Sequence, residues 1–287
     1  MMPSSRSVKW NASANFVGLA YTTVIGIIIL PLYLQYLGAE SFGLVGFFLV
    51  LQAWMQIFDM GMSPLLSRQT AQSRGENAGY RELKRLLRSL ELVFVVIAVV
   101  IFLAVASGSA WIATSWLKVA TLSEDTVADC VVLMGAIVAL RFFAVLYRSG
   151  IQGTENQVAL NIASLVLVTI KFVGALLLLK FVTQDIADFF LYQLFVGGLE
   201  LVAFGVMLYR LIPSSDKVGI GFCWQTLKPV LPFAGGMAYT AGIWVLLTQF
   251  DKLVLSNVLS LAEYGYFALV VVIATGISQV GAPISQA

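Results

Sequence analysis

Long apolar runs separated by short polar segments extend along the whole chain. The runs are about 20 residues long and lack the two-residue alternation of a β-strand, so they favour membrane-spanning helices over a β-barrel. Eight runs are expected to cross the membrane, near residues 12–37, 42–63, 91–117, 127–149, 156–181, 187–211, 229–255 and 263–284. The pattern predicts an all-α membrane protein, a polytopic bundle with eight transmembrane helices.

The amino-acid composition supports this class and excludes several others. Of the 287 residues, 60% are hydrophobic and 11% are charged, which is more apolar surface than a soluble domain of this size can bury. The chain has no histidine and only two cysteines, so neither a Ser-His-Asp active site nor a metal site is expected. The net charge of +2 gives no indication of a nucleic-acid partner. We therefore expect neither an enzyme nor a cofactor-binding protein.

Lysine and arginine residues are distributed unevenly between the two sides of the predicted bundle. They concentrate in the N-terminal segment and in the loops on the same side, whereas the opposite loops hold only Lys118, Lys180 and Lys252. Because basic loops remain in the cytoplasm, the N-terminus is expected to be cytoplasmic.

The loop over residues 64–90 has an amphipathic pattern. Four leucines between positions 83 and 90 recur at helical spacing, opposite four basic residues of the same segment. This pattern predicts a helix that lies on the inner leaflet, where anionic lipids attract it. Such a helix either anchors the topology or recruits a partner enzyme.

Two parts of the chain repeat one pattern in the same order. The stretches 16–22, 40–43 and 61–67 return near 233–240, 263–265 and 281–285. The shared order indicates an internal duplication, with parallel repeats about an axis along the membrane normal. We expect a first six-helix lobe over residues 1–218 and an incomplete second lobe, the first two helices of the repeat, over residues 219–287. The repeat period predicts a whole protein of roughly 430 residues and about 12 spans.

Charged residues inside apolar spans are costly and therefore indicate a functional site. Lys171 and Glu200 lie at similar depths in neighbouring antiparallel spans, within reach of an ion pair. One interpretation is a pair that only neutralises itself. In the other, Lys171 faces an aqueous cavity and attracts an anionic substrate, while Glu200 restrains it or accepts a coupling ion.

Four further charged residues have open roles. Arg141 lies within the fourth span and either extends its side chain to the cytoplasmic interface or forms a cationic wall for phosphate. Asp59 ends the second span and either pairs with a nearby arginine or binds a proton or sodium. Asp251 and Lys252, near the outer end of the seventh span, either pair with each other or take part in ion coupling.

Three stretches carry a family resemblance: NFVG followed by ILPLYLQYLGAESFGLVGFF, the turn FDMG with Ser67-Arg68 after it, and QFDKLVLSNVLSLAEYGYFAL. Together with the span count and topology, they resemble the Wzx-type polysaccharide flippases. These flippases form the polysaccharide-transporter branch of the superfamily that also holds the MATE multidrug exporters. The resemblance covers nearly the whole chain, and it implies a MATE-like transporter of twelve helices in two lobes.

The resemblance implies a function in the bacterial inner membrane. Members of the family carry a polyprenyl-pyrophosphate-linked oligosaccharide across the bilayer, for O-antigen or a related surface glycan, by alternating access between the lobes. Arg141 and Lys171 fit the family's cationic lumen by type and depth, and a coupling ion, H⁺ or Na⁺, and polysaccharide polymerase partners are expected. The alternative is a cation-coupled exporter of drugs or small molecules, with a lumen dominated by acids and aromatics. A glycan polymerase would need a large outer loop, and the longest here, near 118–126, is short.

Overall fold

The computed structural model describes residues 5–73, 79–212, 228 and 231–285. Within this part the chain forms helices and no strand, apart from one isolated bridge between Lys118 and Ser260. The elements are α1 (Ser5–Leu37), α2 (Ala39–Trp54), α3 (Gln56–Asp59), α4 (Met62–Ser73), α5 (Gly79–Trp111), η1 (Ile112–Trp116), α6 (Glu124–Gly153), α7 (Gln157–Thr169), η2 (Ile170–Gly174), α8 (Ala175–Phe181), α9 (Ile186–Leu211), α11 (Leu231–Val258) and α12 (Leu261–Ser285). The η elements are π-helical turns: η1 ends the helix that α5 begins, and η2 joins α7 to α8.

Seven helical segments of the described part are long and apolar enough to cross a membrane. They correspond to seven of the eight predicted spans, so the chain is an all-α, multi-pass membrane protein, as the sequence predicts. The remaining span forms the 28-residue helix α11. Its length suffices, but Gln249, Asp251 and Lys252 interrupt its apolar sequence, and its passage across the membrane stays a prediction.

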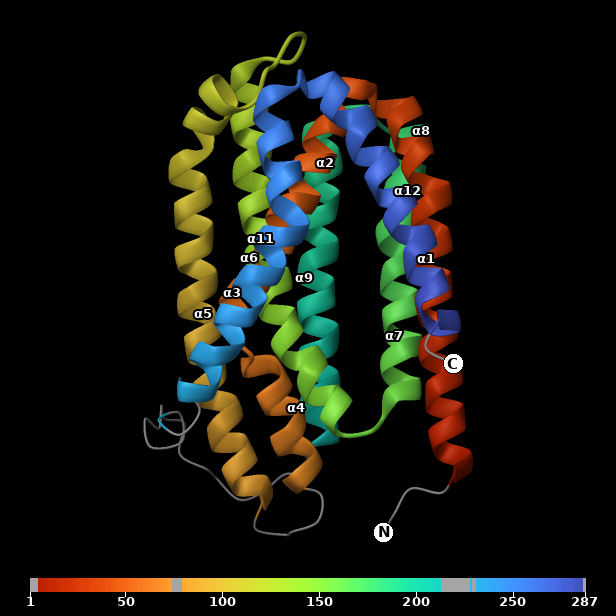
Figure 1. The fold of residues 1–287 in the computed structure, drawn as a ribbon, viewed down its shortest axis with the longest axis vertical. Coiled ribbons are helices and arrows are strands. Elements are labelled where there is room, and N and C mark those ends of the chain that lie inside the picture. Colours follow the sequence, from red (N-terminus) through yellow and green to blue (C-terminus); the bar gives the residue numbers. More distant parts are fainter. Residues whose placement is uncertain (1–4, 74–78, 213–227, 229–230, 286–287) are drawn as a thin grey trace.

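The long helices stand side by side in a bundle (Figure 1), and many of their large apolar side chains are exposed. On α5 the exposed apolar residues recur every three or four positions, which places them along one side of the helix. These residues are Leu92, Val95, Val96, Val99, Val100 and Leu103. An exposed apolar stripe of this length is the surface that lipid covers in a membrane.

The prediction of a surface helix over residues 64–90 is wrong. The described residues of this segment belong instead to α4 and to the first turns of α5, which has 33 residues and is therefore about 50 Å long. Leu83, Leu86, Leu87 and Leu90 are at most 4% exposed and belong to the core. The amphipathic pattern is real, but its apolar face packs against protein rather than lipid.

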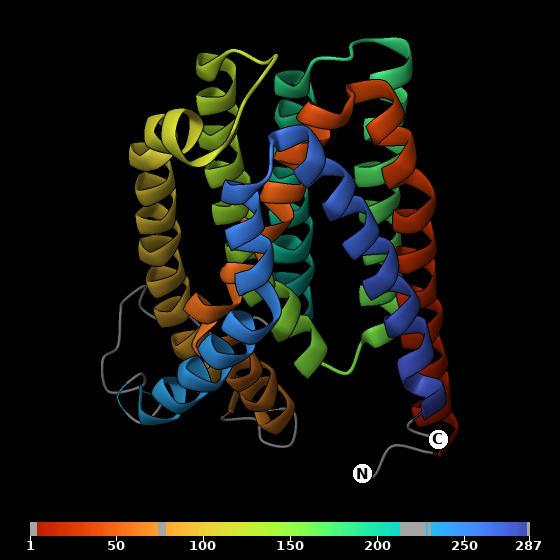
Figure 2. The ribbon, with the colours of Figure 1, turned by 45° about the horizontal axis from the view of Figure 1, so that its top comes forward.

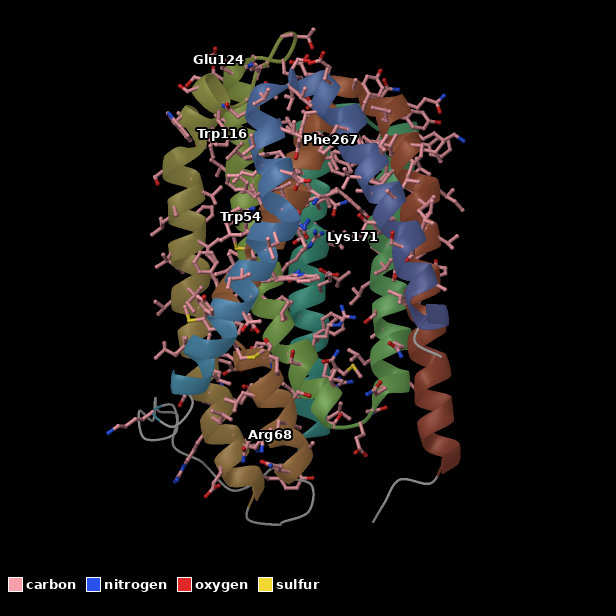
Figure 3. All side chains as sticks on the ribbon, viewed as in Figure 1. Trp54, Arg68, Trp116, Glu124, Lys171 and Phe267 are labelled. Atoms are coloured by element: carbon pink, nitrogen blue, oxygen red, sulfur yellow. The ribbon has the colours of Figure 1, made fainter. Side chains whose placement is uncertain are left out.

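The two ends of the bundle differ in charge and in connectivity. At the basic end lie Arg68, Arg148 and Arg210, and Figure 3 shows Arg68 at the bottom of the bundle. The connections between α1 and α2, η1 and α6, α8 and α9, and α11 and α12 lie at the other end, here called the far end (Figure 1).

Helices α11 and α12 are joined to the preceding helices at the far end. The indole Nε1 of Trp116 donates to Ser256 Oγ at 3.1 Å, and Lys118 Nζ donates to the Val258 carbonyl at 2.8 Å. The amide of Leu261 donates to the Lys118 carbonyl at 3.0 Å. Toward the basic end the two helices separate, so that α11 runs beside α3 and α12 beside α1 (Figures 1 and 2).

A reciprocal contact between α2 and α12 involves residues of the repeated pattern. A Cβ on Gly43 would lie 2.1 Å from the carbonyl oxygen of Leu261, and a Cβ on Gly265 would lie 2.4 Å from that of Ala39. Gly43 follows Ala39 on α2 at the same spacing as Gly265 follows Leu261 on α12. The contact is therefore the same when the two helices are exchanged, which is the pattern of a two-fold, self-complementary contact. The contact is consistent with the proposed duplication. The boundary predicted at residue 218 lies outside the described residues.

We expect Gly43→Ala to lower the free energy of unfolding by about 1–3 kcal/mol, because the new methyl group meets backbone that can only move by separating the helices. Gly265→Ala should have a similar effect, and the double variant should lose less than the sum, because the first substitution already separates the pair. Denaturant unfolding in detergent micelles measures both. In the control Gly242→Ala, nothing lies within 4 Å of the added Cβ, and equal destabilisation by this control would contradict the analysis.

Candidate substrate site

A buried ion pair between α6 and α9 forms the centre of the site. Arg141 Nε lies 3.5 Å from Glu200 Oε2, and their side chains are 12% and 17% exposed. Burying either charge alone would be costly, so each requires the other. Arg141 therefore does not extend to the membrane interface, which was one of its two predicted interpretations.

Two glutamine side chains hold the Arg141 guanidinium in place. Its Nη1 donates to Gln52 Oε1 at 2.9 Å and its Nη2 to Gln193 Oε1 at 2.8 Å. The guanidinium also faces the ring of Phe48, with its Cζ 5.5 Å from the ring centroid. Because a guanidinium has five N–H donors, these contacts leave donors for a ligand.

Lys171 lies in the π-helical turn η2, at mid-height in the bundle (Figure 3). A π-turn disrupts the regular helical hydrogen bonds, and exposed carbonyls are costly in a membrane. Side chains from α1 and α9 satisfy three consecutive carbonyls: Tyr192 donates to Ile170 at 2.7 Å, Gln193 to Lys171 at 3.4 Å and Tyr33 to Phe172 at 2.7 Å. Gln193 thereby links the Lys171 backbone to the Arg141 guanidinium.

The predicted ion pair between Lys171 and Glu200 is wrong, because the structure gives Glu200 a different cationic partner. Glu200 pairs with Arg141, and within the described residues no carboxylate lies within 4 Å of Lys171 Nζ. The ammonium of Lys171 lies instead 5.4 Å from the ring centroid of the neighbouring Phe172. The centre formed by these three charges therefore carries one net positive charge.

Arg141 and Asp59 line one cavity of about 410 Å³ between α2, α3, α6 and α11, here called the Arg141 cavity. Asp59 does not pair with an arginine among the described side chains; its Oδ1 accepts hydrogen bonds from the backbone N–H and the hydroxyl of Ser63 and so caps the start of α4. The cavity therefore has a cation at one wall and a carboxylate at another.

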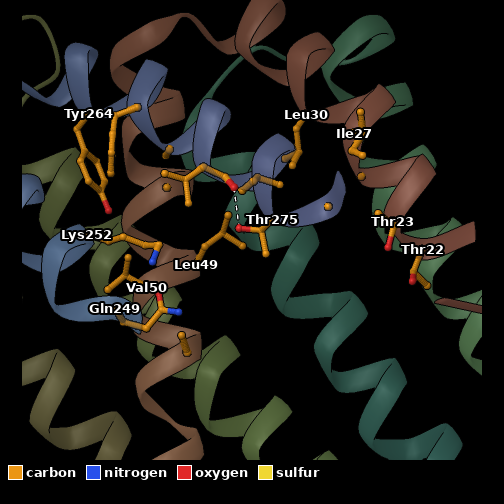
Figure 4. A pocket seen from close by; sticks show the side chains of 18 of the residues that line it. Thr22, Thr23, Ile27, Leu30, Leu49, Val50, Gln249, Lys252, Tyr264 and Thr275 are labelled. Carbon is orange, nitrogen blue, oxygen red and sulfur yellow. Dashed lines mark hydrogen bonds between the residues drawn. The ribbon is translucent and has the colours of Figure 1, made fainter. Parts of the chain in front are cut away.

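Asp251 and Lys252 lie close together at 3.5 Å, in agreement with the expected local pair, and Asp251 is largely exposed. Lys252 also donates to the Thr248 carbonyl. It lines a second, mostly apolar cavity of about 460 Å³ between α1, α2, α11 and α12, where Gln249 and Tyr264 lie near it (Figure 4). The structure thus separates this pair from the Arg141 centre.

Sequence reasoning missed three polar residues of these spans: Gln52, Gln193 and Glu91. The side chains of Gln52 and Gln193 are neutral amides, so they are not found by looking for charged residues inside the spans. Glu91 is 8% exposed and accepts from Tyr147 at 3.0 Å, Tyr209 at 2.6 Å and Arg88 at 3.2 Å. It lies near the predicted start of a span, where a carboxylate gives no signal. These three donors satisfy Glu91 within α5, α6 and α9.

Two comparisons show which known proteins the chain is similar to. A family model described as "Polysaccharide biosynthesis protein" matches residues 8–287. The chain is 22% identical over 266 residues to a Shigella flexneri protein named "Putative O-antigen transporter". This match covers 91% of the chain and 61% of the relative, so the chain spans about three fifths of that relative's length. No solved structure matches the chain significantly.

Arg141→Met should lower the free energy of unfolding by about 3–5 kcal/mol, because it leaves Glu200 as an uncompensated buried charge. The double variant Arg141→Met/Glu200→Leu should recover most of this loss, whereas Lys171→Met should cost less than Arg141→Met. Denaturant unfolding in micelles measures all three, with exposed Arg85→Met as the control. A double variant no more stable than Arg141→Met would contradict the pairing.

Gly174→Ala should disrupt the π-turn, because the new Cβ would lie 1.9 Å from the Tyr192 hydroxyl oxygen. We expect a loss of about 1–3 kcal/mol, partly recovered by adding Tyr192→Phe, which removes the clashing oxygen. Thermal unfolding measures the change. Gly198→Ala on α9 is the matched control, since nothing lies within 4 Å of its Cβ; a loss confined to the control would contradict the assignment.

Proposed function

The chain belongs to the polysaccharide biosynthesis protein family, and from this premise we propose that it carries a lipid-linked oligosaccharide across the bacterial inner membrane. The family match confirms the resemblance to the polysaccharide flippases. The proposed cargo is a polyprenyl-pyrophosphate-linked glycan for O-antigen or a related surface polysaccharide. In this role the protein is a transporter and not an enzyme, with its N-terminus in the cytoplasm.

The observation that carries the proposal is the cationic centre within the bundle. A pyrophosphate head group cannot cross about 30 Å of hydrocarbon unaided, because each buried charge costs several kcal/mol. Arg141 has donors left for phosphate oxygens, and it lines a cavity between the first six spans and α11. Lys171 adds the positive charge that Glu200 does not neutralise.

The arrangement of α11 and α12 supports access from one side. They are joined to the preceding helices at the far end through Trp116 and Lys118, and they separate toward the basic end. We propose that this is the state open to the cytoplasm, in which the head group enters while the lipid tail stays in the bilayer. Only a substrate that binds the two states differently can drive the change between them.

Asp59 is our proposal for the coupling ion, H⁺ or Na⁺. Its carboxylate lines the same cavity as Arg141, so an ion bound there would interact with the head group through the cavity. Glu200 is the second candidate, because it is paired with Arg141 and would release it on protonation.

We expect the gene that encodes this chain to restore surface glycan in a bacterium that lacks its own flippase. Arg141→Ala and Lys171→Ala, at equal expression, should each reduce the restored glycan about tenfold or more, because each removes a charge-assisted contact with phosphate. Glycan is measured on gels of extracted lipopolysaccharide, and exposed Arg85→Ala is the control. Unchanged glycan in both variants would remove these residues from the site, and failure of the unaltered gene would count against the proposed function.

A further inference from the structure

A third cavity lies at the basic end, between α1, α6 and α7, and is separate from the Arg141 centre. Its volume is about 330 Å³, and its polar lining consists mainly of amides and hydroxyls. These lining residues are Thr22, Arg148, Gln152, Gln157, Asn161 and Ser164. We call it the amide cavity.

The polar residues of the amide cavity lie on the same sides of α6 and α7 as the charged residues of the cationic centre. On α6, Arg141, Arg148 and Gln152 are spaced seven and four residues apart, so they lie along one side of the helix. On α7, Asn161 and Ser164 lie on one side in the same way, and seven residues later comes Lys171. Two polar stripes therefore lead from the basic end to the residues proposed for the phosphate. Thr22 lines both this cavity and the one beside Lys252.

The lining is suited to an uncharged, hydroxyl-rich ligand. Amides and hydroxyls both donate and accept hydrogen bonds, as sugar hydroxyls do. Ser164 Oγ is buried and has no hydrogen-bond partner in the described structure, a cost that a bound ligand would remove. Leu160 and Leu165 give the cavity an apolar wall against which the C–H face of a sugar ring can pack. None of its described lining residues is acidic, and Arg148 is its one cation.

We propose that the amide cavity is a saccharide subsite, which holds the first sugars of the glycan while Arg141 and Lys171 hold the pyrophosphate. This inference rests on the proposed function. It assigns recognition of the sugar and recognition of the phosphate to different residues of the same lobe. Removing the amides should therefore affect only glycosylated lipids, whereas removing Arg141 should affect every pyrophosphate lipid.

The test compares two lipids with the chain in lipid nanodiscs: polyprenyl pyrophosphate, and the same lipid carrying a short oligosaccharide of several sugars that begins with N-acetylglucosamine. Binding is measured by microscale thermophoresis. The unaltered chain should bind the glycosylated lipid about tenfold more tightly than the bare lipid, and Asn161→Leu and Gln152→Leu should each remove most of this preference. Arg141→Gln should weaken binding of both lipids equally. Because Gln152 is exposed, its variant decides the test even where Asn161→Leu folds poorly.

Gln72→Leu is the matched control, since it removes an exposed amide from α4, outside the cavity, and should leave both affinities unchanged. Equal affinity of the unaltered chain for the two lipids, or a preference that survives both cavity variants, would overturn the saccharide subsite and leave the proposed function standing. Failure of the unaltered chain to bind either lipid would contradict the proposed function, and the subsite with it.

Discussion

The structure of the bundle interior depends on the burial of one guanidinium. Arg141 lies among apolar helices, where an unpaired charge would be prohibitively costly. Its contacts with Gln52, Gln193 and Glu200 therefore fix α2, α6 and α9 against one another. The same contacts orient the remaining N–H groups, so the interaction that makes the charge tolerable also prepares it to bind an anion.

The irregular backbone at Lys171 follows the same constraint. A membrane helix tolerates a π-turn only where its carbonyls find other donors, and here Tyr33, Tyr192 and Gln193 supply them. Gln193 takes part in both networks, since it accepts from Arg141 and donates to the Lys171 carbonyl. The Arg141 guanidinium and the backbone of Lys171 are thus held by one connected set of hydrogen bonds.

The two ends of the bundle differ, because α11 and α12 pack closely against other helices at the far end and separate from each other at the basic end. The glycines of α2 and α12 allow their backbones to approach closely, as small residues do in membrane helices. Separation of α11 from α12 at the basic end leaves cavities beside the cationic centre and beside Lys252. The proposed transport needs such an asymmetry, because a cavity open at both ends would conduct rather than carry.

Three short stretches of sequence carried the resemblance that predicted the family, and charge inside the spans pointed to Arg141 and Lys171, whose role stays a proposal. Hydropathy along the chain was enough to predict the all-α class and seven spans that the structure forms. These properties are local, because about 20 apolar residues must be helical in lipid whatever their neighbours are. The tertiary structure decided which side chains meet: Glu200 binds Arg141 rather than Lys171, and the leucines from 83 to 90 pack inside the bundle rather than on lipid. The tertiary structure also placed Gln52 and Gln193 in contact with Arg141. The reason is that helix rotation and neighbour choice depend on packing across the whole bundle, which no single stretch of sequence encodes.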